Sequence, residues 1–134
     1  MCDKLTAMKR LTFLLSVLVA LIVPALAQDK VKHVDPAAAA KLIAEGKVTI
    51  IDVRTSDEFS EGHLKGARNI DIMSKDFAAK LGELDKSKPV LVHCQAGGRS
   101  TRALPAFEKL GFSEVYHLDG GMNEWNKAGQ PVVK

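Results

Sequence analysis

Short runs of consecutive apolar residues alternate along the chain with longer stretches in which apolar residues recur every three or four positions. The clearest apolar runs are residues 48–53 (VTIIDV) and residues 90–92 (VLV). Continuous apolarity over so few residues is typical of a strand covered on both faces of a parallel sheet. Three further short strands are expected at residues 31–34, 67–70 and 115–118.

The segments between the predicted strands carry helix start and stop signals. Asp35 and Pro36 provide an N-cap and a first-turn proline for a helix that ends at Gly46. Either Ser56 or Asp57 is expected to cap a short second helix. Three more helices are expected through Phe77, Leu81 and Leu84, from an N-cap at Ser100 or Thr101 through Phe107 and Leu110, and over residues 122–127 with Trp125.

Strands that alternate with helices predict an α/β domain with a mostly parallel, five-stranded sheet and helices on both of its faces. The whole chain has 134 residues, of which 46% are hydrophobic, so it can bury the core of one globular domain. In sheets of this kind the functional groups gather at the carboxyl ends of the strands. Cys94 lies at such an end.

The first 27 residues have the pattern of a secretory signal peptide. A basic start precedes an apolar run over residues 11–23, and residues 25–27 (Ala-Leu-Ala) match a small-residue cleavage site. The alternative is a membrane anchor, but the run is shorter than the roughly 20 residues that a spanning helix needs. We therefore expect a signal peptide at residues 1–27, a mature domain at residues 28–134, and a periplasmic or secreted protein.

Loss of the signal peptide changes the charge and the cysteine content. The formal net charge falls from +3 to +1, because three basic residues leave together with Asp3. So small a charge gives no indication of a nucleic acid or an anionic membrane as partner of the mature form. Cys2 leaves as well, and Cys94 is then a single thiol in an oxidising compartment where cysteines usually pair. A lone thiol in an oxidising compartment indicates a chemical role for Cys94 rather than a structural one.

The residues after Cys94 favour a negative charge on its sulfur. Gly97 and Gly98 allow the loop to turn its backbone N–H groups inward, and the following helix adds its positive N-terminal end. Arg99 brings a full positive charge to the same loop. A thiolate, a persulfide or a bound oxyanion would be stabilised there. The alternative is an inert buried cysteine at a strand end, which the glycines and Arg99 disfavour.

Four blocks of sequence make the chain similar to a single-domain rhodanese, a module of the thiosulfate sulfurtransferase type. In order they are Ile51–Arg54 with Glu58 and Phe59, Gly62–Ala67, Val92–Ser100, and Leu118–Gly121 with Trp125. Each block alone is a weak signal, but the four in this order are specific and span nearly the whole mature chain. With the export signal, the chain resembles small periplasmic sulfurtransferases of the phage-shock-protein E type.

The resemblance implies a rhodanese-like fold and sulfur transfer through a covalent intermediate. The Cys94 thiolate would take the outer sulfur of thiosulfate or a similar donor, hold it as a persulfide, and pass it to a thiophilic acceptor such as cyanide or a thiol. The implied substrate-binding residues are Gln95, Ala96, Gly97, Gly98, Arg99 and Ser100. Asp52 and Arg54 would support the rim of the site, although a plain salt bridge or cap explains them equally well.

Neither a metal nor an organic cofactor is implied. The expected partners are a small-molecule donor and its acceptor, with a thiol protein as another acceptor, and we expect a monomer. In the family that the chain resembles, cationic loops accompany thiosulfate as donor and small neutral loops accompany mercaptopyruvate, so the resemblance and the one arginine of this loop favour thiosulfate. The presence of Cys94, Arg99 and Ser100 disfavours a non-catalytic interaction module, but it does not separate an enzyme from a persulfide carrier that serves one partner protein.

Two other cysteine chemistries fit less well. Related cysteine phosphatases use Cys-x5-Arg, whereas Cys94 and Arg99 form Cys-x4-Arg, and the loop has no acidic residue to serve as general acid. Thioredoxin-like exchange lacks the second cysteine of a C-x-x-C pair.

The histidines are given structural interpretations. His63 lies in a turn motif and His93 lies next to Cys94 at a strand end, and packing is the expected role of both. His33 and His117 are too far apart in the sequence to suggest a metal site.

Overall fold

The computed structural model describes residues 30–134. The predicted signal peptide and Cys2 lie outside these residues. The strands are β1 (Val31–Val34), β2 (Thr49–Asp52), β3 (Arg68–Asn69), β4 (Val90–His93) and β5 (Val115–Leu118). The helices are α1 (Pro36–Ala44), α2 (Ser56–Glu61), α3 (Phe77–Gly82), α4 (Gly98–Lys109) and α5 (Gly121–Lys127). No helix among these residues is long and apolar enough to cross a membrane.

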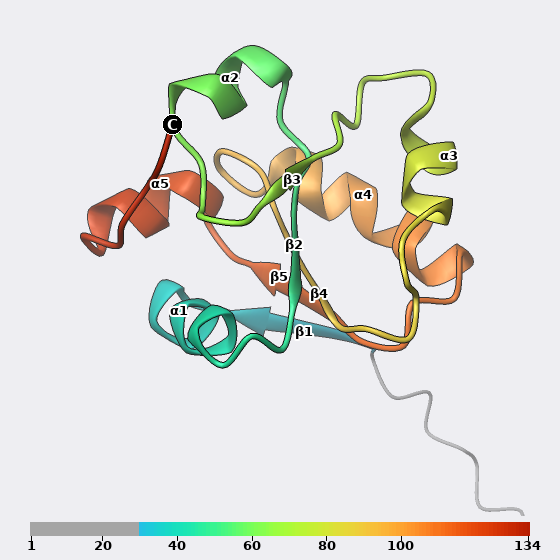
Figure 1. Ribbon diagram of the computed structural model, residues 1–134, viewed down its shortest axis with the longest axis horizontal. Coiled ribbons are helices and arrows are strands. Elements are labelled where there is room, and N and C mark those ends of the chain that lie inside the picture. Colours follow the sequence, from blue (N-terminus) through green and yellow to red (C-terminus); the bar gives the residue numbers. More distant parts are fainter. Residues whose placement is uncertain (1–29) are drawn as a thin grey trace, which may run out of the picture.

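The five strands form one sheet in the order β1-β5-β4-β2-β3, and every neighbouring pair is parallel. Helices α3 and α4 cover one face of the sheet, and α1 and α5 cover the other (Figure 1). The α/β fold with helices on both faces is therefore confirmed. β3 is shorter than the predicted strand at 67–70 because it pairs with β2 at only two positions.

The continuous apolar run in β4 follows from its place in the middle of the sheet, where all four residues are buried. Successive side chains of a strand point to opposite faces. Val92 joins the core that contains Phe107 of α4, and Leu91 joins the core that contains Trp125 of α5. Both faces of the strand need apolar side chains, so no polar alternation appears in the sequence.

The helix starts agree with the sequence at α1 and differ at α2. Asp35 caps α1 as predicted, with its carboxylate accepting a backbone N–H at 2.8 Å. The cap of α2 is Thr55, so the prediction of Ser56 or Asp57 is wrong. Thr55 and Glu58 form a reciprocal capping box, in which each side chain accepts a hydrogen bond from the other residue's backbone N–H.

The predicted N-cap of α4 at Ser100 or Thr101 is also wrong. The helix begins at Gly98, and its N-cap is Gly97, which has a φ of +107° that glycine adopts readily. The hydroxyls of Ser100 and Thr101 lie in the first turn and donate back to the Gly97 carbonyl at 3.1 and 2.6 Å. Only three residues therefore lie between Cys94 and the start of the helix.

A close contact between α5 and the end of β4 provides a test of this arrangement. Gly121 has a φ of +53°, and a β-carbon there would lie 2.3 Å from the Cys94 carbonyl oxygen. Gly129 has a similar φ of +72° with no atom within 4 Å of such a β-carbon. The left-handed backbone alone costs an alanine about 1–2 kcal/mol, and forced overpacking adds about 1–3 kcal/mol.

We expect Gly121→Ala to lower the free energy of unfolding by both amounts and Gly129→Ala by the first alone. Urea denaturation of the two variants measures the difference. Equal losses in the two variants would show that the approach of α5 to Cys94 is not a constraint on the fold.

Candidate functional site

Cys94 directly follows β4 at the carboxyl edge of the sheet and is only 1% exposed. Its Sγ accepts a hydrogen bond from the Gly97 backbone N–H at 3.1 Å and from the Ser100 hydroxyl at 3.3 Å. Both donors belong to the start of α4. The loop thus surrounds the sulfur with donors.

The hydrogen bonds determine the ionisation of the Cys94 thiol. Burial raises its pKa, but the Ser100 hydroxyl and the backbone N–H groups of Ser100, Gly97 and Ala96 lower it more, and the net pKa is below that of an ordinary cysteine. Donors that face the sulfur favour the thiolate over the thiol. The geometry is suited to a nucleophilic sulfur.

The start of α5 holds the other side of the loop. Backbone N–H groups of Met122 and Asn123 donate to the carbonyl oxygens of Cys94 and Gln95, each at 3.0 Å. Because these carbonyls are tied to α5, the N–H groups at the start of α4 are free to face Sγ. The close approach of Gly121 to the Cys94 carbonyl is part of the same contact.

Asp52 and Arg54 form a buried ion pair beneath the loop. The Arg54 guanidinium donates to both Asp52 carboxylate oxygens at 2.8–3.1 Å, and only 4% of its side chain is exposed. It also donates to the Gly62 carbonyl at 2.7 Å and to Gln95 Oε1 at 3.0 Å. The pair therefore connects the end of β2 to two loops, and one of these is the loop after Cys94.

The Arg99 side chain is bound to Glu58 of α2. Its two terminal nitrogens donate to the two Glu58 carboxylate oxygens at 2.6 and 2.7 Å. These hydrogen bonds lower the pKa of Glu58 to about 2, against a smaller opposing effect of burial and with help from the Thr55 backbone. Glu58 thus fixes Arg99 as well as capping α2.

The remaining predicted loop residues take different positions. Gln95 donates through Nε2 to Asn123 Oδ1 at 2.7 Å, and Gly98 is the first residue of α4. A cavity of about 220 Å³ lies beside Gln95. It is lined by Arg54, Glu58, Glu61, Gly62, Gln95, Met122, Asn126 and Val132. Cys94 and Arg99 are not part of its wall.

His63 and His93 pack as predicted. The His63 ring stacks on Phe59 with 3.7 Å between ring centroids, and it bonds the Phe59 carbonyl. His93 is fully buried and contacts the Cys94 carbonyl through Nδ1 at 3.0 Å. Burial lowers the pKa of His93, so its imidazole is neutral at neutral pH.

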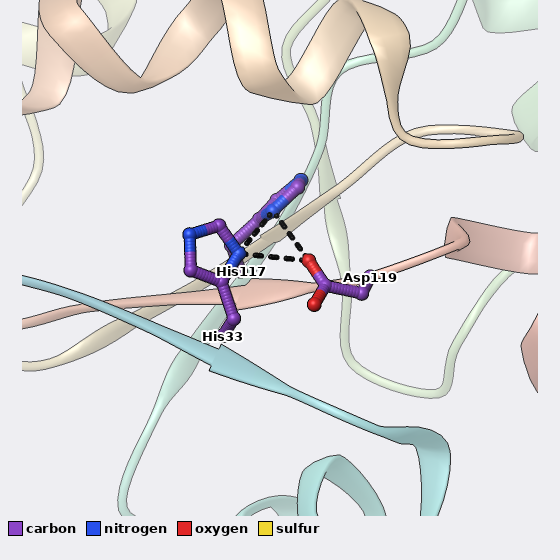
Figure 2. A group of neighbouring side chains, drawn as sticks. All are labelled: His33, His117 and Asp119. Atoms are coloured by element: carbon purple, nitrogen blue, oxygen red, sulfur yellow. Dashed lines mark hydrogen bonds and ion pairs between the residues drawn. The ribbon is translucent and has the colours of Figure 1, made fainter.

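His33 and His117, which are too far apart in the sequence to suggest a metal site, lie side by side in the structure. β1 pairs with β5 in a register that puts His33 directly beside His117, although they are 84 residues apart. Asp119 follows two residues later on the same side of the chain, and the three side chains face one another (Figure 2). His117 also reaches Ser100, with 2.7 Å between Nε2 and Oγ. The sequence carries one hint of this cluster, because His117 and Asp119 stand two positions apart at the end of a predicted strand.

Comparisons with known proteins agree with the sequence and the fold. Residues 35–128 match the model of the rhodanese-like domain family. The chain is 32% identical over 97 residues to thiosulfate sulfurtransferase GlpE of Shewanella oneidensis, covering 72% of this chain and 94% of that protein. It is 40% identical over 79 residues to YqhL of Bacillus subtilis, covering 59% of this chain and 61% of that protein.

Among solved structures, the chain is similar to a rhodanese-related protein from Thermoplasma volcanium. The TM-score is 0.69 at 28% sequence identity, and the match covers 76% of this chain and 97% of that structure.

The pairing of Glu58 with Arg99 predicts a pH dependence of stability. The folded-state pKa of Glu58, about 2, lies below the ordinary value of 4.5. The carboxylate therefore stabilises the fold above the ordinary value and loses this effect as the pH falls through the folded-state pKa. We expect Glu58→Gln to be less stable than wild type near pH 6, with the difference shrinking towards pH 2. Urea denaturation across this range checks it, with Glu61→Gln on the same helix as control. A difference independent of pH would contradict it.

Proposed function

The chain belongs to the rhodanese-like domain family, its similarity to named sulfurtransferases supports sulfur transfer as its general activity, and we propose that thiosulfate is its donor and a Cys94 persulfide its intermediate. The Cys94 thiolate attacks the outer sulfur of thiosulfate, the S–S bond of the donor breaks, and sulfite leaves with the bonding electron pair. A thiophilic acceptor such as cyanide or a thiol then removes the outer sulfur and regenerates the thiolate. One observation carries the proposal: Sγ is buried among hydrogen-bond donors at the start of α4.

The hydrogen-bond donors around Sγ suit both the Cys94 thiolate and the Cys94 persulfide. A persulfide carries its negative charge on the terminal sulfur, and backbone N–H groups that face inward stabilise such an anion. No general base is needed when the loop already lowers the pKa of Cys94. The loop residues Gln95–Ser100 are therefore proposed to hold the transferred sulfur.

Arg99 supports an anionic donor. Glu58 raises the pKa of Arg99, and the nearby Cys94 thiolate adds to this effect, so the guanidinium stays charged beside the site. A guanidinium matches the oxygens of a sulfonate-like group. We propose that Arg99 attracts thiosulfate, while Glu58 holds the Arg99 guanidinium in position.

The short loop disfavours phosphatase chemistry. Only Gln95–Gly97 separate Cys94 from the first residue of α4. This leaves less backbone to surround a tetrahedral phosphate than the longer Cys-x5-Arg loop does. We also propose, from the signal-peptide pattern of residues 1–27, that the protein acts after export.

The covalent step is tested by intact-mass measurement. We expect wild type treated with thiosulfate and freed of excess donor to gain ~32 Da, and cyanide to remove this mass as thiocyanate. Cys94→Ser should gain nothing under the same conditions. A folded wild-type protein that shows no adduct would contradict thiosulfate as donor, and an adduct that persists in Cys94→Ser would contradict Cys94 as the carrier.

The role of Ser100 is tested by the reactivity of Cys94. Loss of one hydrogen bond to a charged group costs about 1.5–3 kcal/mol, which corresponds to a pKa higher by about 1–2 units. We expect Ser100→Ala to shift the pH profile of Cys94 alkylation by iodoacetamide upwards by that amount.

Thr101→Ala is the matched control, because its hydroxyl also donates to the Gly97 carbonyl but does not reach Sγ. Profiles that shift equally in both variants would show that the hydroxyls act only on the loop backbone.

A further inference from the structure

At the carboxyl ends of β1 and β5, His33, His117 and Asp119 bring three metal-ligating atoms together. Their Nδ1, Nδ1 and Oδ1 atoms are separated by 2.8, 3.1 and 3.2 Å. We propose that these three residues bind a divalent transition-metal ion of the Zn²⁺ class, and that this ion acts on Cys94 through Ser100.

The placement follows from the sheet. Side chains two residues apart on a strand lie on the same face. His117 and Asp119 therefore share the α4 face of β5, and the parallel register places His33 beside His117 on that face. The cluster does not depend on a flexible loop, because two of its members are strand residues.

The spacing suits a single ion. At bond lengths of about 2.1 Å, ligand atoms lie about 3.0 Å apart at right angles and about 3.4 Å apart in a tetrahedron. The separations of 2.8–3.2 Å need to open by only a few tenths of an ångström. The side chains of His33 and Asp119 are 52% and 58% exposed, so they can adjust and an ion can enter from solvent.

The protons of the cluster also favour an ion. With an ion present, the Asp119 carboxylate and the two imidazoles each direct a lone pair at the same point. Without an ion, the N–H groups of both histidines have to converge on Asp119 Oδ1. Two imidazoles and a carboxylate are a common ligand set for zinc, with the remaining positions open to water.

The other nitrogen of His117 links this cluster to the cysteine. Ligating histidines usually donate their second N–H to a fixed partner. Here that partner is Ser100 Oγ, at 2.7 Å from His117 Nε2. With a metal on Nδ1, the ring proton resides on Nε2 and is donated to Ser100, and the Ser100 hydrogen is then free to point at Cys94 Sγ.

The metal site is tested without the thiol. The purified Cys94→Ser protein is titrated with Zn²⁺ in a calorimeter, and Co²⁺ serves as a spectroscopic probe of ligand number. We expect one ion per chain, with His33→Gln and Asp119→Asn each weakening binding at least about tenfold.

His63→Gln is the control, because it removes a histidine outside the cluster. Circular dichroism confirms that each variant is folded. Affinity that is unchanged in His33→Gln and Asp119→Asn, or no binding at millimolar Zn²⁺, would overturn the site.

The coupling is tested by alkylation of Cys94 with and without Zn²⁺. We expect Zn²⁺ to speed alkylation of wild type near neutral pH by more than about twofold. Ser100→Ala removes the partner of His117 Nε2, so it should weaken zinc binding by about tenfold and, at saturating Zn²⁺, lose this effect. Slower alkylation with zinc would show that the ion binds the thiolate, and would overturn the coupling. This step rests on the proposed thiolate, whereas the titration of Cys94→Ser does not, so the two failures are distinguishable.

Discussion

The short connection between β4 and α4 is the constraint on which the site depends. Four residues, Cys94–Gly97, turn the chain from the strand into the helix, and the turn requires a left-handed residue at Gly97. Because the helix starts so early, the Gly97 N–H and the Ser100 hydroxyl both face Cys94 Sγ. Each hydrogen bond to a charged sulfur contributes about 1.5–3 kcal/mol. The loop thereby offsets the cost of burying a thiolate, and its backbone conformation sets how well the negative charge on Sγ is stabilised.

The buried Asp52–Arg54 pair has a positioning role in this arrangement. Desolvation makes a buried ion pair weak evidence for stability. Arg54, however, uses its remaining donors on the Gly62 carbonyl and on Gln95, so it ties two loops to the end of β2. Glu58 of α2 binds Arg99, so charged groups from the end of β2 and from α2 both hold the Cys94 loop.

The sequence predicts those features whose cause is local. β2 and β4 are recognisable because burial on both faces demands a continuous apolar run, and Asp35 is recognisable because an aspartate before a proline is a strong helix start. The sequence predicts a later start of α4 than the structure has, because serine is a preferred N-cap residue type whereas Gly97 adopts the N-cap backbone conformation. The positive φ of Gly97 follows from the turn that the chain makes between β4 and α4. Serine is common both just before and just after a helix start, so Ser100 alone does not locate the start.

Contacts that depend on strand order are not readable in the same way. Arg99 and Glu58 are 41 residues apart, and their pairing requires α2 to lie over the start of α4. The neighbourhood of His33 and His117 requires β5 to lie between β1 and β4. The hydrophobic pattern sets which segments are strands but leaves their lateral order open, so it carries no information on either contact.

Ser100 connects the two groups of polar residues through a single hydrogen atom. Its Oγ lies 3.3 Å from Cys94 Sγ, 3.1 Å from the Gly97 carbonyl and 2.7 Å from His117 Nε2. A hydroxyl has one hydrogen to donate and two lone pairs to accept with. When Nε2 carries a proton it donates to Oγ, and the hydroxyl hydrogen can stabilise the thiolate. When Nε2 is bare it competes for that hydrogen at the shortest of the three distances, and the backbone N–H groups remain to hold the charge. The tautomer of a histidine on β5 therefore governs how well the loop stabilises an anion on Cys94.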